Sequence, residues 1–308
     1  MFKPFRPLLL SLLALLTAFG IIACQGTPEA GGGGSDSSDP IRVGSKDFTE
    51  QLILGEMYAI ALENAGFEVE RKLNLGGTPV AQAALENKEI DLYPEYTGTG
   101  LLTVLKQPAE SDQQAVYDTV SQQYQEKFDL VWLEPAPMNN TQALAMTQAQ
   151  SEQLGIKTIS EMAAQANSLV MIGPPEFEIR EDGLVGLKQA YGNFELEAYK
   201  AVDAGLRYQG LVDGEADVAV AFGTDGEISA FDLVLLEDDK KLFPPYQVAP
   251  VVRQETLEAN PKIADVLNGL APLLTDETMQ QLNYEVSNGG KEPATVAQEF
   301  LAASAVLQ

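Results

Sequence analysis

The chain has 308 residues, enough for about two domains, and its content of 45% apolar and 21% charged residues is that of an ordinary globular protein. Lysine and arginine number 19 against 45 acidic residues, and the formal charge of −26 argues against nucleic acid as a partner because the surface would repel phosphates. The absence of histidine excludes Ser-His-Asp and Cys-His catalytic systems, and the single cysteine, Cys24, excludes an intramolecular disulfide and a thiolate metal cluster.

The N-terminus has the pattern of an export signal. Lys3 and Arg6 precede an apolar stretch over residues 8–23, which is shorter than the roughly 20 residues that a membrane-spanning helix needs. We therefore predict a signal peptide over residues 1–23. Its end, Ile-Ile-Ala followed by Cys24, resembles the bacterial lipobox, and this resemblance implies that the Cys24 thiol receives lipid.

A flexible tether follows over residues 24–40. This segment contains four consecutive glycines, 31–34, and no apolar periodicity, so it should behave as a coil that holds the folded part away from the membrane. No later segment approaches eighteen uninterrupted apolar residues. We expect an exported protein that is anchored to the membrane by lipid, on the periplasmic or extracellular face, and that passes anything it transports to a membrane partner.

The remaining chain alternates between strand and helix patterns, which predicts an α/β fold. Asp47 and Glu50 have the spacing of a capping box at the start of a helix that Gly66 ends, and Thr224 and Glu227 repeat this spacing at a later helix. Thr78 should cap the second helix, with Pro79 at its first position. The predicted strands lie at 41–43, 67–73, 89–93, 130–133, 143–146, 169–172 and 217–222. The other predicted helices lie at 98–105, 111–128, 183–191, 206–213 and 224–230.

The alternating strands and helices fall into two units along the chain, and we predict that each unit forms a lobe. The tail from residue 254 is helical by pattern and has no strands of its own, so we expect it to pack on the first unit. This predicts lobe I from residues 41–139 plus 247–308 and lobe II from residues 140–246. Two crossings, near Asn140 and Pro245, would join the lobes, and ligands preferentially bind in a cleft of this kind.

Six sequence blocks carry a family resemblance. They are Val43 to Gln51 (VGSKDFTEQ), Asp91 to Gly100 (DLYPEYTGTG), Asn139 to Thr141 (NNT), Arg180 to Leu184 (REDGL), Gly223 to Gly226 (GTDG) and Phe243 to Tyr246 (FPPY). In this order and spacing the chain resembles the osmoprotectant-binding proteins, extracytoplasmic receptors for glycine betaine, choline and carnitine that serve ABC importers. The resemblance implies a type II periplasmic-binding-protein fold, a permease and its ATP-binding subunit as partners, and neither catalysis nor a cofactor.

The resemblance also implies a ligand site. A quaternary ammonium has no N–H group, so aromatic faces hold it, whereas a carboxylate needs a fixed cation and hydroxyl donors. Tyr96 and Tyr246 match cage tyrosines of the family, and Phe222 falls where the family commonly has tyrosine. The matches to the carboxylate-binding positions are Lys46, Thr99 and Arg180.

Gln142 departs from the family pattern, because it falls where another cage tyrosine is usual. This departure leaves open a receptor of the same fold for a different zwitterion, such as a bulkier trimethylated amino acid or an ordinary amino acid. Two other classes also remain as alternatives: an enzyme that uses Asp91 and Glu95 for acid–base chemistry, and a surface lipoprotein that only scaffolds partners.

Overall fold

The computed structural model describes residues 39–180, 183–202, 204–304 and 306. The predicted signal peptide, Cys24 and nearly all of the predicted tether lie outside this range. Within it, none of the helices combines the length and the apolar character needed to cross a membrane.

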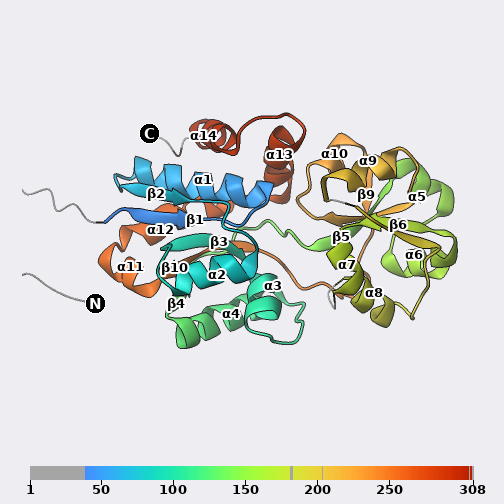
Figure 1. Ribbon diagram of the computed structural model, residues 1–308, viewed down its shortest axis with the longest axis horizontal. Helices are drawn as coiled ribbons and strands as arrows, with labels where there is room; N and C mark the ends of the chain where they lie inside the picture. The colour runs from blue at the N-terminus through green and yellow to red at the C-terminus, as the bar shows by residue number, and fades with distance from the viewer. Residues whose placement is uncertain (1–38, 181–182, 203, 305, 307–308) are drawn as a thin grey trace, which may run out of the picture. The chain divides into compact units, whose positions relative to one another are not determined.

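Strands and helices alternate along the chain, as the sequence pattern predicts (Figure 1). The strands are β1 (Ile41–Gly44), β2 (Val69–Lys72), β3 (Leu92–Tyr96), β4 (Leu130–Trp132), β5 (Gln142–Thr147), β6 (Val170–Gly173), β7 (Ala198–Ala201), β8 (Val218–Phe222), β9 (Leu233–Leu235) and β10 (Val248–Arg253). The α-helices before residue 180 are α1 (Thr49–Asn64), α2 (Thr78–Glu86), α3 (Thr97–Thr99), α4 (Gln113–Phe128), α5 (Gln148–Leu154), α6 (Ile159–Gln165) and α7 (Pro175–Ile179). The later α-helices are α8 (Leu184–Ala190), α9 (Arg207–Val212), α10 (Glu227–Ala230), α11 (Gln254–Ala259), α12 (Lys262–Asn268), α13 (Asp276–Ser287) and α14 (Pro293–Ala303). Short 3₁₀ or π turns are η1 (Gly100–Val104), η2 (Ala166–Ser168), η3 (Ala204–Leu206) and η4 (Ala271–Leu273).

The strands form two mixed sheets, each of five strands. The first has the order β2-β1-β3-β10-β4, and only β10 runs antiparallel to its neighbours. The second has the order β7-β6-β8-β5-β9, in which β5 is the antiparallel strand beside β8 and β9. We call the part built on the first sheet lobe I and the part built on the second lobe II. The predicted α/β class with two units is confirmed.

Both faces of each sheet are covered, which is why its strands are rich in apolar residues. On one face of the first sheet, α1 and the C-terminal helices pack on residues such as Leu92 and Val248, and on the other face α2, η1 and α4 pack on Tyr93 and Val251 (Figure 1). The second sheet repeats the arrangement, with α9 on one face and α5, α6 and α8 on the other. Strand β10 was not predicted: the sequence pattern placed no strand after residue 222, yet β10 returns the chain to lobe I.

Three expected helix caps are wrong, and all three involve residues of the cleft described below. Phe48 occupies the N-cap of α1 without a side-chain cap, and Glu50 is bonded elsewhere instead of completing a box with Asp47. Gly77, rather than Thr78, precedes α2. The Thr224–Glu227 spacing likewise forms no box, because α10 starts after Gly226 without a side-chain cap. Instead of capping helices, the side chains of Glu50 and Thr78 accept hydrogen bonds from Tyr96 and Lys46, which are distant along the chain.

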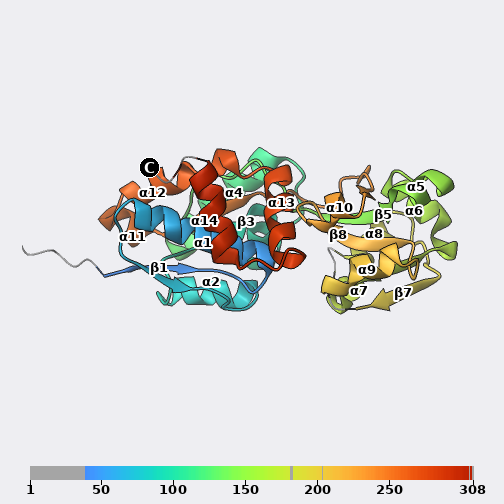
Figure 2. The ribbon, with the colours of Figure 1, turned by 90° about the horizontal axis from the view of Figure 1, so that it is seen from above.

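The two crossings between the lobes run next to each other. Asn139 pairs with Gln247 as an antiparallel bridge, and the Asn140 amide donates to the Tyr246 carbonyl at 3.1 Å. Helix α13 adds a third link, because it packs against α10 of lobe II (Figure 2). Its Gln280 Nε2 donates to the Gly223 carbonyl at 2.8 Å.

Candidate ligand-binding cleft

A cavity of about 1140 Å³ is lined by residues of both lobes. It brings together every residue that the sequence predicted for ligand binding: Lys46, Tyr96, Thr99, Gln142, Arg180, Phe222 and Tyr246. Further residues line it that the sequence analysis did not select, and the most informative are Phe48, Glu50, Asn140, Arg207 and Asn283. The residues predicted for ligand binding therefore line a single cavity.

Aromatic rings form part of the lobe I wall. Tyr96 ends β3 and is only 3% exposed, and its ring centroid lies 6.2 Å from that of Phe48 at an interplanar angle of 22°. Phe48 is 40% exposed and lines the same cavity. A large apolar ring left accessible at a cavity wall offers a face to a cation or to methyl groups. Phe48 lies inside the first of the family-like sequence blocks, two residues after Lys46, and that position could have identified it.

Tyr246 reaches the cavity from the second crossing. Its amide donates to Asn139 Oδ1 at 2.7 Å, and its ring packs on the backbone of Gly98. A Cβ atom at Gly98 would lie 2.8 Å from both the ring and the Pro245 carbonyl, so only glycine permits this approach. The glycine two residues after Tyr96 thus lets the Tyr246 ring pack against α3.

Lys46 forms a buried ion pair. Its Nζ atom lies 2.5 Å from Glu95 Oε1 and 3.3 Å from Thr78 Oγ1, and the two charged side chains are 4% and 0% exposed. The same Nζ lies 4.9 Å from the Tyr96 ring centroid. Glu95 also accepts from the Tyr96 amide, at 2.7 Å. In this arrangement Glu95 holds the ammonium group at the cavity wall, beside the ring of Tyr96.

Glu50 is a buried carboxylate at the same wall. Oε1 accepts from the Tyr96 hydroxyl at 2.6 Å and from Asn140 Nδ2 at 2.8 Å, and Oε2 accepts from Asn283 Nδ2 at 2.8 Å. Burial raises the pKa of Glu50, and hydrogen bonds from Thr224, Tyr96, Asn283 and Asn140 oppose that rise. Burial and the neighbouring Glu50 charge raise the pKa of Tyr96 well above its ordinary value, so its hydroxyl stays protonated and donates.

On the lobe II wall, Gln142 and Phe222 are direct partners in the register of β5 and β8, so their side chains lie side by side. The Arg207 guanidinium lies 5.6 Å from the Phe222 ring centroid and 4.5 Å from that of Tyr208. Arg207 Nη2 donates to Asp225 Oδ2 at 2.5 Å. Burial alone would lower the pKa of Arg207, but Asp225 and Tyr208 raise it above its ordinary value. We did not predict Arg207 as a site residue, because nothing in its helical sequence pattern distinguishes it from an ordinary surface arginine.

Thr99 and Arg180 complete the predicted set. Thr99 ends α3 on lobe I and is partly exposed, whereas Arg180 follows α7 on lobe II and is exposed. Both line the cavity, from opposite lobes.

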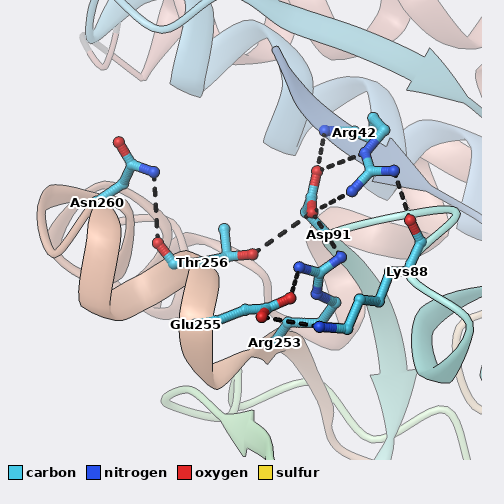
Figure 3. Close-up of polar contacts among 7 residues, drawn as sticks. All are labelled: Arg42, Lys88, Asp91, Arg253, Glu255, Thr256 and Asn260. Atoms are coloured by element: carbon cyan, nitrogen blue, oxygen red, sulfur yellow. Dashed lines mark hydrogen bonds and ion pairs between the residues drawn. The ribbon is translucent and has the colours of Figure 1, made fainter. Parts of the chain in front are cut away.

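The two carboxylates considered for acid–base chemistry have other partners. Asp91 accepts from Arg42 Nη2 at 2.8 Å and forms an ion pair with Arg253 at 3.2 Å, in a cluster that links β1, the start of β3 and the end of β10 (Figure 3). Asp91 does not line the cavity, and Glu95 is the partner of Lys46. Within the described part of the chain, no group of three or more acidic, cysteine or histidine side chains is arranged to hold a metal ion.

Comparison with known proteins identifies relatives over most of the chain. Residues 39–303 match the family model described as the substrate-binding domain of an ABC-type glycine betaine transport system. A glycine-betaine-binding protein of Pseudomonas aeruginosa is 37% identical over 290 residues, covering 91% of this chain and 92% of that protein. The carnitine transport binding protein OpuCC of Listeria monocytogenes is 33% identical, covering 95% and 94%. An ergothioneine transport permease/ergothioneine binding protein of Helicobacter pylori is 35% identical, covering 85% of this chain and 47% of that protein.

Solved structures give the same result. A structure described as a glycine betaine/carnitine/choline ABC transporter matches with a TM-score of 0.80 at 30% identity, covering 87% of this chain and all (100%) of that one. Ligand-free YehZ of Escherichia coli matches with a TM-score of 0.73 at 31% identity and the same coverage, 87% and 100%. These matches confirm the type II periplasmic-binding-protein fold. The chain belongs to the family of substrate-binding domains of ABC-type glycine betaine transport systems, whose members bind a substrate for an importer and are not enzymes.

Proposed function

We propose that this protein captures glycine betaine or a related quaternary-ammonium compatible solute outside the cytoplasm and delivers it to an ABC permease and its ATP-binding subunit. The observation that carries the proposal is the meeting of Tyr96, Tyr246, Lys46 and Arg180 at one cavity. Aromatic faces suit a methylated cation, and fixed cations suit its carboxylate.

The roles of the site residues follow from their chemistry. Tyr96, Tyr246 and Phe48 would contact the methylated ammonium, while Lys46, Thr99 and Arg180 would hold the carboxylate. Phe222 would contribute one ring face from lobe II, because Arg207 lies against this ring as well. Thr99 and Arg180 come from different lobes, so a ligand bound to both favours closure of the lobes upon it.

Titration calorimetry of the purified protein with glycine betaine, proline betaine, carnitine and choline tests the proposal. Saturable binding of at least one of these compounds is expected. If no methylated amine produces heat or raises the unfolding temperature, the proposal is wrong, and a protein that only scaffolds partners becomes the better interpretation.

The division of roles predicts two different mutant phenotypes. Tyr96→Ala should weaken choline and glycine betaine together, by about tenfold or more, because an aromatic contact with a desolvated cation contributes up to about 2 kcal/mol. Arg180→Ala should weaken glycine betaine at least about tenfold but choline by less than about threefold, because choline has no carboxylate. Calorimetry measures both effects, and Tyr96→Leu, which keeps an apolar side chain in the core, controls for misfolding. Equal losses for both ligands in Arg180→Ala would contradict the assignment.

A second candidate is a receptor for a different zwitterion, and Gln142 favours it. Gln142 is buried at 5% exposure beside Phe222, and an amide at this wall can donate to or accept from a ligand group that simple betaines lack. The relative named for ergothioneine also supports a ligand other than glycine betaine. An ordinary amino acid or a bulkier trimethylated amino acid would fit this description.

Replacing the amide by a ring distinguishes the two candidates. If Gln142 leaves the aromatic cage with one ring fewer than is usual in the family, Gln142→Tyr should strengthen glycine betaine binding by about threefold to tenfold, the range expected for one added ring contact. An unchanged dissociation constant in calorimetry, with the fold intact by circular dichroism, would leave the thinned-cage interpretation without support.

The membrane anchor is a separate part of the proposal. The lipobox-like sequence supports cleavage after residue 23 and lipidation of Cys24, with residues 24–40 as tether between the membrane and the lobes, which we place at 41–139 plus 247–308 and at 140–246. Mass spectrometry of the N-terminal peptide from the native membrane fraction tests this. A peptide that begins upstream of Cys24, or an unmodified thiol, would contradict it.

A further inference from the structure

Glu50 differs from the other buried charges at the cleft. Lys46 pairs with Glu95, and Arg207 pairs with Asp225. Glu50 is 3% exposed and lines the cavity, yet among the described residues no lysine or arginine forms an ion pair with it. A buried carboxylate loses several kcal/mol of hydration, and neutral hydrogen-bond donors restore only part of this. Such a group is a candidate for function.

The contacts of Glu50 direct its charge toward the proposed cation site. Its side-chain partners include the Tyr96 hydroxyl, Asn140 Nδ2 and Asn283 Nδ2, and each of these donates to the carboxylate. A set of donors suits a carboxylate, which only accepts, better than a protonated carboxyl group. The Tyr96 hydroxyl connects this negative charge to the ring that lines the cavity, so a cation on that ring lies close to Glu50.

We propose that Glu50 is the counter-charge for the ligand's ammonium group, acting through the Tyr96 side chain that it positions. The inference deepens the proposed function and rests on it. The protein's own cation at this ring, Lys46 with Nζ 4.9 Å from the Tyr96 centroid, is already paired with Glu95, so a ligand cation would balance the charge of Glu50. The same contacts make Glu50 a positioning residue, because its hydrogen bonds fix the hydroxyl end of Tyr96 relative to Asn140 in the crossing and Asn283 on α13.

The size of the effect follows from Coulomb's law. A cation on the Tyr96 ring would lie roughly 7 to 8 Å from the carboxylate, and at an effective dielectric constant of about 20 the loss of that charge weakens binding by roughly thirtyfold. Because Glu50 must be ionised to act, the affinity for a cation should also fall as the pH is lowered toward its raised pKa. The ionisable group in contact with Glu50 is Tyr96 on β3, and the contact from α13 is the neutral Asn283. The other charged side chains that line the same cavity are Lys46, Asp47, Lys106, Arg180, Arg207, Asp225 and Glu227.

The test compares wild-type protein with Glu50→Gln and Glu56→Gln, using choline as the probe because it has no acidic group. Glu56 is a matched control, since it lies on the same helix, bonds to Arg71 at 2.7 Å and does not line the cavity. By calorimetry at pH 8, Glu50→Gln should bind choline roughly thirtyfold more weakly and Glu56→Gln as wild type does. From pH 8 to pH 5 the wild-type affinity should fall, whereas that of Glu50→Gln should stay flat.

A stability measurement separates this role from a structural one. At pH 8 the ligand-free Glu50→Gln protein should unfold at a somewhat lower temperature than wild type, because its Nε2 atom faces a donor from which the carboxylate accepted. A variant that melts earlier but binds choline with wild-type affinity, or one that keeps the wild-type pH dependence, would overturn the inference. If wild-type protein binds no methylated amine at all, the proposed function itself is wrong; if it binds them and Glu50→Gln binds equally well, only the role of Glu50 is wrong.

Discussion

Glu95→Ala should lower the free energy of unfolding by about 3 to 5 kcal/mol at pH 7, the range measured when one partner of a buried ion pair is removed. The change would leave the Lys46 ammonium, 4% exposed, without its carboxylate. It would also remove the acceptor of the Tyr96 amide at 2.7 Å and of the Tyr93 hydroxyl at 2.9 Å. Denaturant unfolding followed by circular dichroism measures the loss.

Two control variants test whether the stability loss in Glu95→Ala comes from the buried ion pair. The double variant Lys46→Met/Glu95→Gln removes both charges and keeps an acceptor for the Tyr96 amide, so it should recover most of the stability but not the affinity for glycine betaine. Glu195→Ala breaks an ion pair with Lys188 whose side chains are 31% and 80% exposed, and it should cost less than about 1 kcal/mol. A Glu95→Ala protein within about 1 kcal/mol of wild type would mean that water reaches Lys46 and that the pair is not buried in solution.

The sequence predicted the fold class because apolar periodicity and turn residues are local signals. The helix from Gln113 to Phe128 and the strand at Leu130 lie almost where the pattern placed them, and Gly66, which ends the first helix, adopts a φ of 95°. Strand β10 was missed because Pro250 interrupts its apolar run, and a proline inside such a run argues against a strand. Its residues Val248 to Arg253 become a strand by pairing with β3 and β4, from which more than a hundred residues separate them.

In the candidate site, too, local sequence signals were predictive, whereas contacts between distant segments were not predicted. Motif blocks identified residues that line one cavity, but capping rules gave Glu50 the wrong role. Those rules consider only the backbone within one helical turn, whereas Glu50 bonds to Tyr96, Asn140 and Asn283, which are distant along the chain. Arg207 was missed for a related reason. A guanidinium at a cavity wall has the same sequence signature as one at any surface, and only the fold distinguishes the two.

The acidic side chain of Asp225 organises the lobe II wall, and Asp225→Ala should lower the free energy of unfolding by about 2 to 3 kcal/mol. Oδ2 of Asp225 accepts from Arg207 Nη2 at 2.5 Å, from the Phe222 amide at 2.8 Å and from the Tyr208 hydroxyl. The expected loss is smaller than for Glu95 because the Asp225 side chain is 22% exposed, so water can replace part of the interaction.

Asp225→Ala should also weaken ligand binding. Arg207 lies against the Phe222 ring at 5.6 Å, so loss of its carboxylate partner frees both side chains to move and should weaken choline and glycine betaine alike. Asp213→Ala is the matched control, because Asp213 is an exposed residue at the end of α9 whose carboxylate accepts from Gln209 Nε2 at 2.8 Å. Denaturant unfolding and calorimetry of both variants test the prediction. If Asp225→Ala matched Asp213→Ala in both measurements, the Arg207–Asp225 pair would be a surface contact, and the lobe II wall would depend on Gln142 and Phe222 alone.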